Sequence, residues 1–293
     1  LARSISELPL LIVLAYRRSD PIRSEMQSAR LETLPYFSKI GLTELPAAEA
    51  ETLIRAKLAQ FAPERMEAIP RALIDRITAQ AEGNPFYIEE LLNYLRDRGL
   101  DPFDRSSLTT LELPNSLHRL ILSRIDQLTE RQALILKVAR IIGQIFKFAH
   151  LHGYYPTLGA PEHVKENLDE LQRLDLTSLQ IPEPELTYLF KHVVTQEVAY
   201  ASIGFSTRAA LHEQYARYLE QQISVNAIPE SAALDTLAYQ YSRSENVDKQ
   251  REYLGRAGEA AQATFANSIA LDYYEQLLPL LTVPRERIAI QIK

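Results

Sequence analysis

The sequence predicts a mainly α-helical protein with a small β component. From about Pro46 onward, apolar residues recur at the three- and four-residue spacing of amphipathic helices. Two segments differ: Leu10–Tyr16 is a continuous apolar run, typical of a strand buried on both faces, and Leu186–Phe190 alternates like a half-buried strand. The chain of 293 residues is long enough for about two domains, or for more if they are small.

Composition and charge exclude several kinds of site. The chain contains no cysteine, which excludes disulfides, thiolate metal sites and cysteine nucleophiles. No apolar run approaches the ~20 residues that span a bilayer, and the net charge of −6 offers no overall basic surface for nucleic acid. We therefore expect a cytoplasmic protein that binds neither DNA nor a membrane. Leu1 is not a start methionine, so we expect the chain to be a piece of a longer protein.

Residues 1–45 are expected to hold the only strands before the hairpin near residue 186. Besides Leu10–Tyr16, the segment Phe37–Leu42 is a second short strand candidate. Two strands do not make a stable covered sheet alone. We therefore expect the partner strands to lie upstream of Leu1.

Residues 46–100 are expected to form a compact unit of three helices. Gly83 suits the C-terminal cap of the second helix, Asn84 is a good N-cap, and Pro85 fits the first turn of the third. Glu89 and Glu90 are adjacent, so their side chains point in different directions, and we assign them to a first turn where negative charge is favoured. The expected helices are Ala47–Gln60, Pro70–Glu82 and Pro85–Arg98.

A linker over 101–113 is expected to lead into a second unit, residues 114–202. Thr129 and Gln132 resemble a capping box, and Gly143 closes the helix that it opens. A further helix over Pro161–Leu174 and a β-hairpin turning at residues 182–184 favour a winged helix. The Pro161–Leu174 helix carries four acidic and two basic residues, which argues against a role in reading DNA.

Residues 203–293 are expected to be helical repeats. The segments Val247–Thr264 and Asn267–Leu281 predict an antiparallel pair. Small residues such as Gly258 alternate there with Tyr253 and Tyr274, which is typical of stacked hairpins of the tetratricopeptide (TPR) kind. We expect this region to expose an aromatic-rich surface that binds a protein partner.

Phosphate-binding and metal-binding signals are absent from the sequence. No G-x-x-x-x-G-K-[ST] segment occurs, and no apolar strand ends in paired acids. Because phosphate and Mg²⁺ positioning do most of the work in phosphoryl transfer, we expect no ATP hydrolysis by this chain alone. His150 and His152 lack a nearby acidic ligand and are assigned to a loop. No catalytic residue and no metal ligand is assigned.

Four segments, in the same order, resemble one family, the STAND-class AAA+-related signalling ATPases. The resemblance is to bacterial multidomain regulators that carry nucleotide-cyclase or protein-kinase modules. It implies that residues 1–45 are the C-terminal remnant of a parallel α/β NTPase core lacking its Walker A and Walker B segments. It also implies a helical lid at 46–100, a winged helix at 114–202 and TPR-like repeats at 203–293. The segments are LLIVLAYR (Leu10–Arg17), AEGNPFYIEELL (Ala81–Leu92), LPNSLHRLILSRIDQL (Leu113–Leu128) and FKHVVTQEVAY (Phe190–Tyr200).

The resemblance implies roles for four residues. In the family, ATP or ADP with Mg²⁺ lies between the core and the lid plus winged helix. Arg17 would be the sensor arginine facing the γ-phosphate, and Asn84-Pro85 would lie near the adenine. His192 resembles the histidine of the Met-His-Asp motif that contacts the β-phosphate of ADP, although Lys191 and Val193 replace Met and Asp here. A purely structural role stays open for each residue. Arg17 would be the polar end of a buried strand, Asn84-Pro85 would mark the boundary between two helices, and His192 would be a buried structural histidine.

Two functions follow from these expectations. The first is the regulatory part of a nucleotide-dependent signal-transduction ATPase, in which the lid and winged helix close over ATP or ADP and relay its state to the repeats. The nucleotide would be held only with the upstream core, since this chain alone is expected to retain none. The alternative is a helical-repeat protein-interaction scaffold with no nucleotide dependence.

Overall fold

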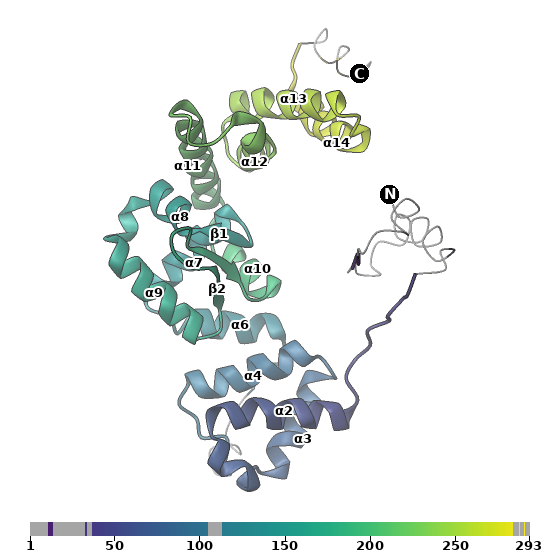
Figure 1. The fold of residues 1–293 in the computed structure, drawn as a ribbon, viewed down its shortest axis with the longest axis vertical. Helices are drawn as coiled ribbons and strands as arrows, with labels where there is room; N and C mark the ends of the chain where they lie inside the picture. The colour runs from purple at the N-terminus through teal and green to yellow at the C-terminus, as the bar shows by residue number, and fades with distance from the viewer. Residues whose placement is uncertain are drawn as a thin grey trace.

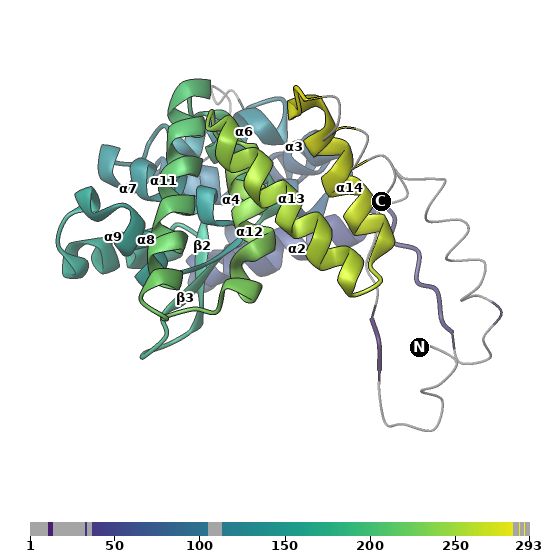
Figure 2. The same cartoon turned by 90° about the horizontal axis from the view of Figure 1, so that it is seen from above.

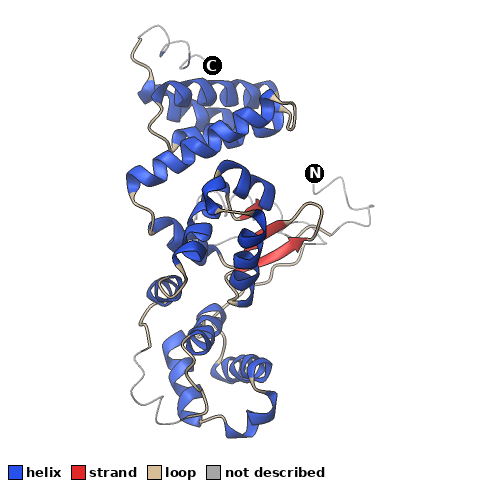
Figure 3. Cartoon of the chain, turned by 90° about the vertical axis from the view of Figure 1, so that its left-hand side faces the viewer, coloured by secondary structure: helices blue, strands red, loops and turns tan. Residues whose placement is uncertain are grey.

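The computed structural model of the protein describes residues 11–13, 33, 37–104, 113–283, 287 and 290. It is mainly helical, which confirms the predicted class, and its helices form three tiers along the longest axis (Figures 1 and 3). We name these tiers the lower helical unit (47–104), the middle unit (113–203) and the upper helical stack (204–283). Among the described helices, none combines the length and apolar character needed to cross a membrane.

The lower helical unit has the three predicted helices, and a 3₁₀ turn joins the first two. Its core is formed by the predicted apolar faces, with Ile54, Ile77 and Leu91, one from each helix, fully buried. Removing such side chains from water is worth about 1.5–3 kcal/mol each, so this packing accounts for the stability of the unit. The elements are α2 (Ala47–Phe61), η2 (Pro63–Ala68), α3 (Arg71–Ala81) and α4 (Pro85–Asp97).

The turn between α3 and α4 follows the predicted capping chemistry. The Asn84 side chain accepts a hydrogen bond from the Phe86 backbone N–H at 3.0 Å, as an N-cap does. Gly83 has φ +75°, and a Cβ there would lie 2.7 Å from Cβ of Glu44 and 2.8 Å from the Leu45 carbonyl oxygen. Only glycine fits this position, because both the backbone angle and the space exclude a side chain.

The strand predictions for the N-terminal region are not confirmed. Residues 37–46 form no regular secondary structure, so the strand predicted at Phe37–Leu42 is wrong; the described residues place no neighbouring strand beside it to pair with its backbone. Of Leu10–Tyr16, only Leu11–Val13 is described, and it is exposed and not in a strand. The rest of that segment, and Arg17, lie outside the described residues. Of the predicted linker, residues 101–104 and 113 are described, and 101–104 contain a turn.

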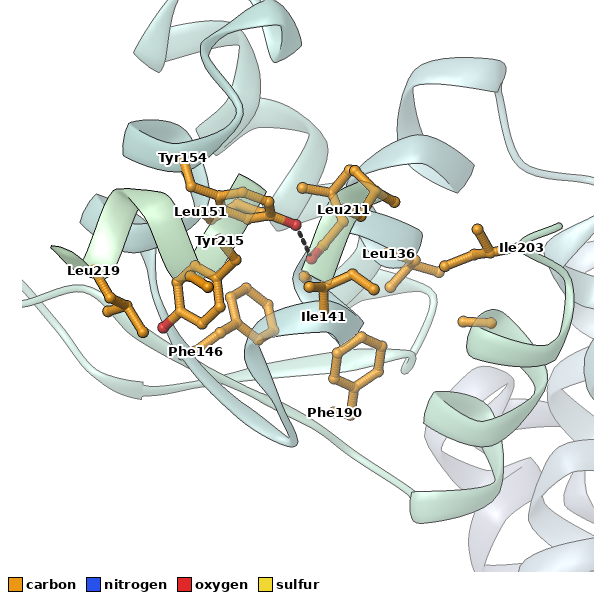
Figure 4. Packing of buried hydrophobic residues seen from close by; sticks show 14 of the residues in the cluster. Leu136, Ile141, Phe146, Leu151, Tyr154, Phe190, Ile203, Leu211, Tyr215 and Leu219 are labelled. Carbon is orange, nitrogen blue, oxygen red and sulfur yellow. Dashed lines mark hydrogen bonds between the residues drawn. The ribbon is translucent and has the colours of Figure 1, made fainter. Parts of the chain in front are cut away.

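The middle unit combines helices with a three-stranded antiparallel sheet of order β1-β3-β2. The predicted hairpin is β2 and β3, but β1, which pairs Phe146 with Tyr188, was not predicted. Phe146, Tyr188 and Phe190 face the core, where Figure 4 shows Phe146 between Tyr215 and Phe190. The elements are α6 (Leu117–Ile125), α7 (Glu130–Ile142), β1 (Ile145–Lys147), α8 (Phe148–Tyr154), η3 (Pro156–Leu158), α9 (Pro161–Arg173), β2 (Thr177–Ile181), β3 (Thr187–Phe190) and α10 (Val193–Ala201).

His150 and His152 lie on α8, so their assignment to a loop is wrong. His150 Nδ1 is 3.0 Å from the Tyr215 hydroxyl, and His152 Nε2 is 2.9 Å from the Gly159 carbonyl oxygen. The helix was missed because α8 is short and begins directly after β1 without a side-chain cap. A segment of this length shows too little periodicity to predict a helix.

The upper helical stack is formed by four consecutive helices, each packed on the next. Seen from above, α8, α9 and α11 lie on one side of the molecule and α13 and α14 on the other (Figure 2). The predicted pairing of the last two helices is confirmed. Tyr253 and Tyr274 are buried, so the prediction that they belong to an exposed aromatic surface is wrong. The elements are α11 (Phe205–Ser224), α12 (Glu230–Ser242), α13 (Val247–Ala263), α14 (Asn267–Leu277) and η4 (Leu278–Leu280).

Gly258 is required for the close packing of α13 on α14. A Cβ at this position would lie 2.4 Å from Cε1 of Tyr274, so Gly258→Ala forces the ring or the helix to move. We expect a loss of about 1–3 kcal/mol in unfolding free energy, as for other overpacked sites. Gly255→Ala on the same helix is the control: its Cβ would meet only Leu277 at 3.7 Å, and helix propensity favours alanine by about 1 kcal/mol. Urea denaturation of both variants measures the difference, and equal stabilities would contradict the packing argument.

Candidate functional site

The contact between the lower helical unit and the middle unit contains a buried ion-pair network. The Arg124 side chain on α6 is 1% exposed and pairs with Glu90 at 2.5 Å and with Asp97 at 2.8 Å, both on α4. Arg124 also donates a hydrogen bond to the Leu174 carbonyl oxygen at the end of α9. One guanidinium therefore joins α4 to two elements of the middle unit.

Burial and mutual attraction act against each other in this network. Burial raises the pKa of the Glu90 carboxyl, while the charge of Arg124 and its hydrogen bond lower it. For Arg124, burial favours loss of the proton, but Glu90 and Asp97 hold its pKa above the ordinary value. The ionised state of each group therefore depends on the other, since a lone buried charge is strongly disfavoured.

A second charged cluster lies next to the first. Asp175 follows α9 in a left-handed conformation, with φ 64°. It accepts hydrogen bonds from the Lys191 ammonium, from Lys57 of α2 at 3.3 Å and from Asn93 of α4 at 3.3 Å. Burial opposes ionisation of Asp175, but the hydrogen bond and charge of Lys191, with those of Lys57, lower its pKa to about 2. This carboxylate is thus ionised at neutral pH and links the two units.

His192 lies at the same contact, directly before α10. Its ring packs on Phe86 of α4, with 3.8 Å between the ring centroids. Burial, followed by the charge of Lys191, lowers the pKa of His192 to about 4, so the imidazole is neutral at pH 7. Its Nε2 atom is buried and has no hydrogen-bond partner among the described residues. Such an atom is uncommon in folded proteins and marks a position where a ligand or water would be stabilised.

The structure brings together the predicted segments of the site that it describes. Asn84 and Pro85 are exposed at the start of α4, and the next residue, Phe86, contacts His192. Asn84 uses its side chain as the helix N-cap. Arg17 lies outside the described residues. The contact formed by Asn84, Pro85, Phe86, His192 and the two charged clusters is called the junction below.

Sequence reasoning missed the charged residues of the junction. Glu89 and Glu90 were assigned to the first turn of their helix, which is wrong: α4 begins at Pro85, so both lie beyond that turn, and Glu90 is fully buried. A signal was present, because Arg124 falls in the apolar stripe of Leu120 and Ile121 at helical spacing. Opposite charges inside the apolar stripes of two helices predict a buried pair between them.

Comparison with known proteins identifies one part of the chain. A family model described as a domain of unknown function, DUF8739, matches residues 47–100. No curated protein and no solved structure matches the chain. In the part of the chain that the structure describes, no group of three or more His, Asp or Glu side chains is arranged to hold a metal ion. The matched range spans α2 to α4, so the family match covers the side of the junction that carries Phe86, Glu90 and Asp97.

Proposed function

We propose that the chain is the regulatory part of a STAND-type signalling ATPase. In this proposal the lower helical unit is the lid, the middle unit is a winged helix, and both close over ATP or ADP held by an upstream core. The order of elements supports it: three helices come first, and then a unit in which helices are combined with a three-stranded antiparallel sheet. The upper helical stack would be the start of a TPR-like repeat region that binds a protein partner.

The observation that carries the proposal is the environment of His192. A buried ring nitrogen without a partner costs stability unless a ligand or water satisfies it. Because the imidazole is neutral at pH 7, one ring nitrogen carries hydrogen and can donate to a phosphate oxygen. Phe86 covers the ring in this structure, so a nucleotide would reach Nε2 only after a shift of α4 relative to His192. The proposal thus couples nucleotide contact to the position of the lid.

A route from the junction to the upper helical stack is present in the packing. His192 is the residue before α10, which packs on α6 and α7, and α7 in turn packs on α11 of the stack. A change in the position of α10 would therefore displace α7 and, through it, α11 at the base of the stack. We propose this as the path by which the nucleotide state reaches the repeats.

His192→Ala tests the proposal in the protein that includes the upstream core. We expect the affinity for a fluorescent ADP analogue to fall by about 10- to 100-fold, because a hydrogen bond to a charged phosphate is worth about 1.5–3 kcal/mol. His163→Ala, at an exposed position of α9, should leave the affinity unchanged. Equal affinities for wild type and His192→Ala would remove the support for a nucleotide contact. Arg17→Ala should instead weaken the response to ATP.

An interaction scaffold without nucleotide dependence is the second candidate. Large apolar side chains on α14 favour it, since Ile269 is 50% and Leu271 58% exposed. Apolar side chains at the end of a helical stack are typical of a surface that a further helix or partner covers. The two candidates differ in one measurement: the scaffold predicts that partner binding is the same with ADP, with ATP and without nucleotide.

A further inference from the structure

Three arginines from three elements gather where the middle unit meets the upper helical stack. The guanidinium carbons of Arg140 on α7 and Arg208 on α11 lie 4.8 Å and 4.2 Å from the centre of the Tyr200 ring. Arg243, which follows α12, lies 4.4 Å over the ring of Tyr239. All three charges act on one side chain, His212, whose ring centroid is 5.7 Å from that of Tyr200 and 6.2 Å from that of Tyr239, so the three arginines lie in one region.

A buried histidine fixes the aromatic platform of this arginine cluster. His212 is fully buried; its Nε2 is 2.9 Å from the Tyr200 hydroxyl and its Nδ1 is 2.5 Å from the Gln240 side-chain oxygen. Gln240 in turn donates a hydrogen bond to the Ile141 carbonyl oxygen at 2.9 Å. The Tyr200 ring therefore has a defined position before any ligand binds, which reduces the ordering cost of binding.

The positive charge of the arginine cluster is not balanced by a carboxylate. None of Arg140, Arg208 and Arg243 forms an ion pair with an acidic side chain in the described part of the chain. Burial, together with the charges of these three arginines, lowers the pKa of His212 to about 4, against the opposing hydrogen bond with Gln240. An uncompensated cluster of this kind attracts anions.

The hydrogen-bond donors of the cluster are only partly used. Arg208 donates through Nη2 to the Ile203 carbonyl oxygen at 2.9 Å, while its Nε is buried without an acceptor in the described structure. When the Gln196 amide is oriented with its oxygen toward Arg140, it accepts from Nε and Nη1, both at 3.3 Å. Arg140 and Arg208 thus donate to neutral amide and carbonyl oxygens. Their fork-shaped guanidinium groups form stronger hydrogen bonds with charged oxyanions.

We propose that Arg140, Arg208 and Arg243, with Tyr200, form a binding site for the phosphate group of a small ligand. The site is separate from the junction, because His192 and Tyr200 lie at opposite ends of α10, about 12 Å apart at 1.5 Å per residue. It joins two tiers: Arg140 belongs to the middle unit, and Arg208 and Arg243 belong to the upper helical stack. A bound phosphate would therefore strengthen the contact between these tiers.

Titration of the full chain with inorganic pyrophosphate at constant ionic strength tests the proposal. We expect saturable binding by calorimetry, with a Kd of about 1 mM or tighter. Arg208→Gln should weaken it at least about tenfold, since charge-assisted hydrogen bonds to the ligand are lost. Arg243→Gln, at an exposed position, should also weaken binding and leaves the buried contacts intact. Arg217→Gln is the matched control on α11, because this arginine is already paired with Glu213.

The outcomes separate this site from the junction. Binding that survives in Arg217→Gln and His192→Ala but is lost in Arg208→Gln and Arg243→Gln supports the proposal. Three results would overturn it: no saturable binding by the wild type, an equal loss in Arg217→Gln, or a loss in His192→Ala with binding retained in Arg208→Gln. A loss in His192→Ala would place pyrophosphate at the junction, whereas a loss in Arg208→Gln and Arg243→Gln places it at the arginine cluster.

Discussion

Arg124→Ala is expected to lower the free energy of unfolding by about 3–5 kcal/mol, because it leaves two acidic side chains buried without their positive partner. Glu90 is 1% and Asp97 9% exposed at the side chain, so water cannot replace the lost guanidinium. The hydrogen bond to the Leu174 carbonyl oxygen is lost as well. Thermal and urea denaturation, followed by circular dichroism, measure the change.

The control for Arg124→Ala lies on the same helix. Arg119 is exposed and its side chain donates to Asn115 at the surface, so Arg119→Ala should change stability by no more than about 0.5 kcal/mol. Glu90→Gln removes one buried charge, and combining it with Arg124→Ala should cost less than the two changes added together. If Arg124→Ala were as stable as Arg119→Ala, the network would not hold the two units together.

Much of the helical fold is encoded locally and could be predicted from the sequence. The Thr129–Gln132 capping box is present with both reciprocal hydrogen bonds, and Gly143 ends the helix as expected. The buried face of α9, Val164, Leu168 and Leu171, follows directly from its apolar period. In each case, residues within four positions of one another supply the whole signal.

Elements defined by distant contacts could not be predicted. Strand β1 is three residues long and exists through its pairing with β3, whose paired residues lie 40 to 44 positions later in the chain. Phe37–Leu42 shows the reverse error, since a β-like composition forms no strand where no partner is placed beside it. The composition of a segment shows that it can form a strand, but the strand forms only where a neighbouring strand pairs with its backbone.

The residues of the candidate site were likewise predictable only in part. Asn84, Pro85 and His192 were found through a family resemblance, and the structure adds that Phe86 joins them in space. Arg124 and Glu90 carried a local signal as charges in apolar stripes, but Asp175 and Lys191 did not. The arginine cluster combines residues 140, 208 and 243, each of which alone is typical of an ordinary polar position in or directly after a helix. Its charge becomes visible only when three helices are packed together.

Acidification from pH 6.5 to 4 is expected to destabilise the protein through His212. Its pKa is lowered to about 4 in the folded chain by burial, against an ordinary value of 6.5. Protons therefore bind the unfolded state first, so the stabilisation is complete above pH 6.5 and is lost as the pH falls toward 4. A shift of this size corresponds to about 3 kcal/mol. His192, whose pKa is also lowered to about 4, adds a loss in the same pH window.

A difference measurement isolates the contribution of His212. Carboxylates also begin to titrate near pH 4, so the unfolding free energy of His212→Gln is compared with that of the wild type at each pH. Glutamine keeps polar groups near Tyr200 and Gln240 but has no proton to bind, so the variant should lose less stability between pH 6.5 and 4. His163→Gln, which alters an exposed histidine, should follow the wild type. Parallel curves for wild type and His212→Gln would mean that folding does not lower the pKa of this imidazole, and would contradict the expected acid destabilisation.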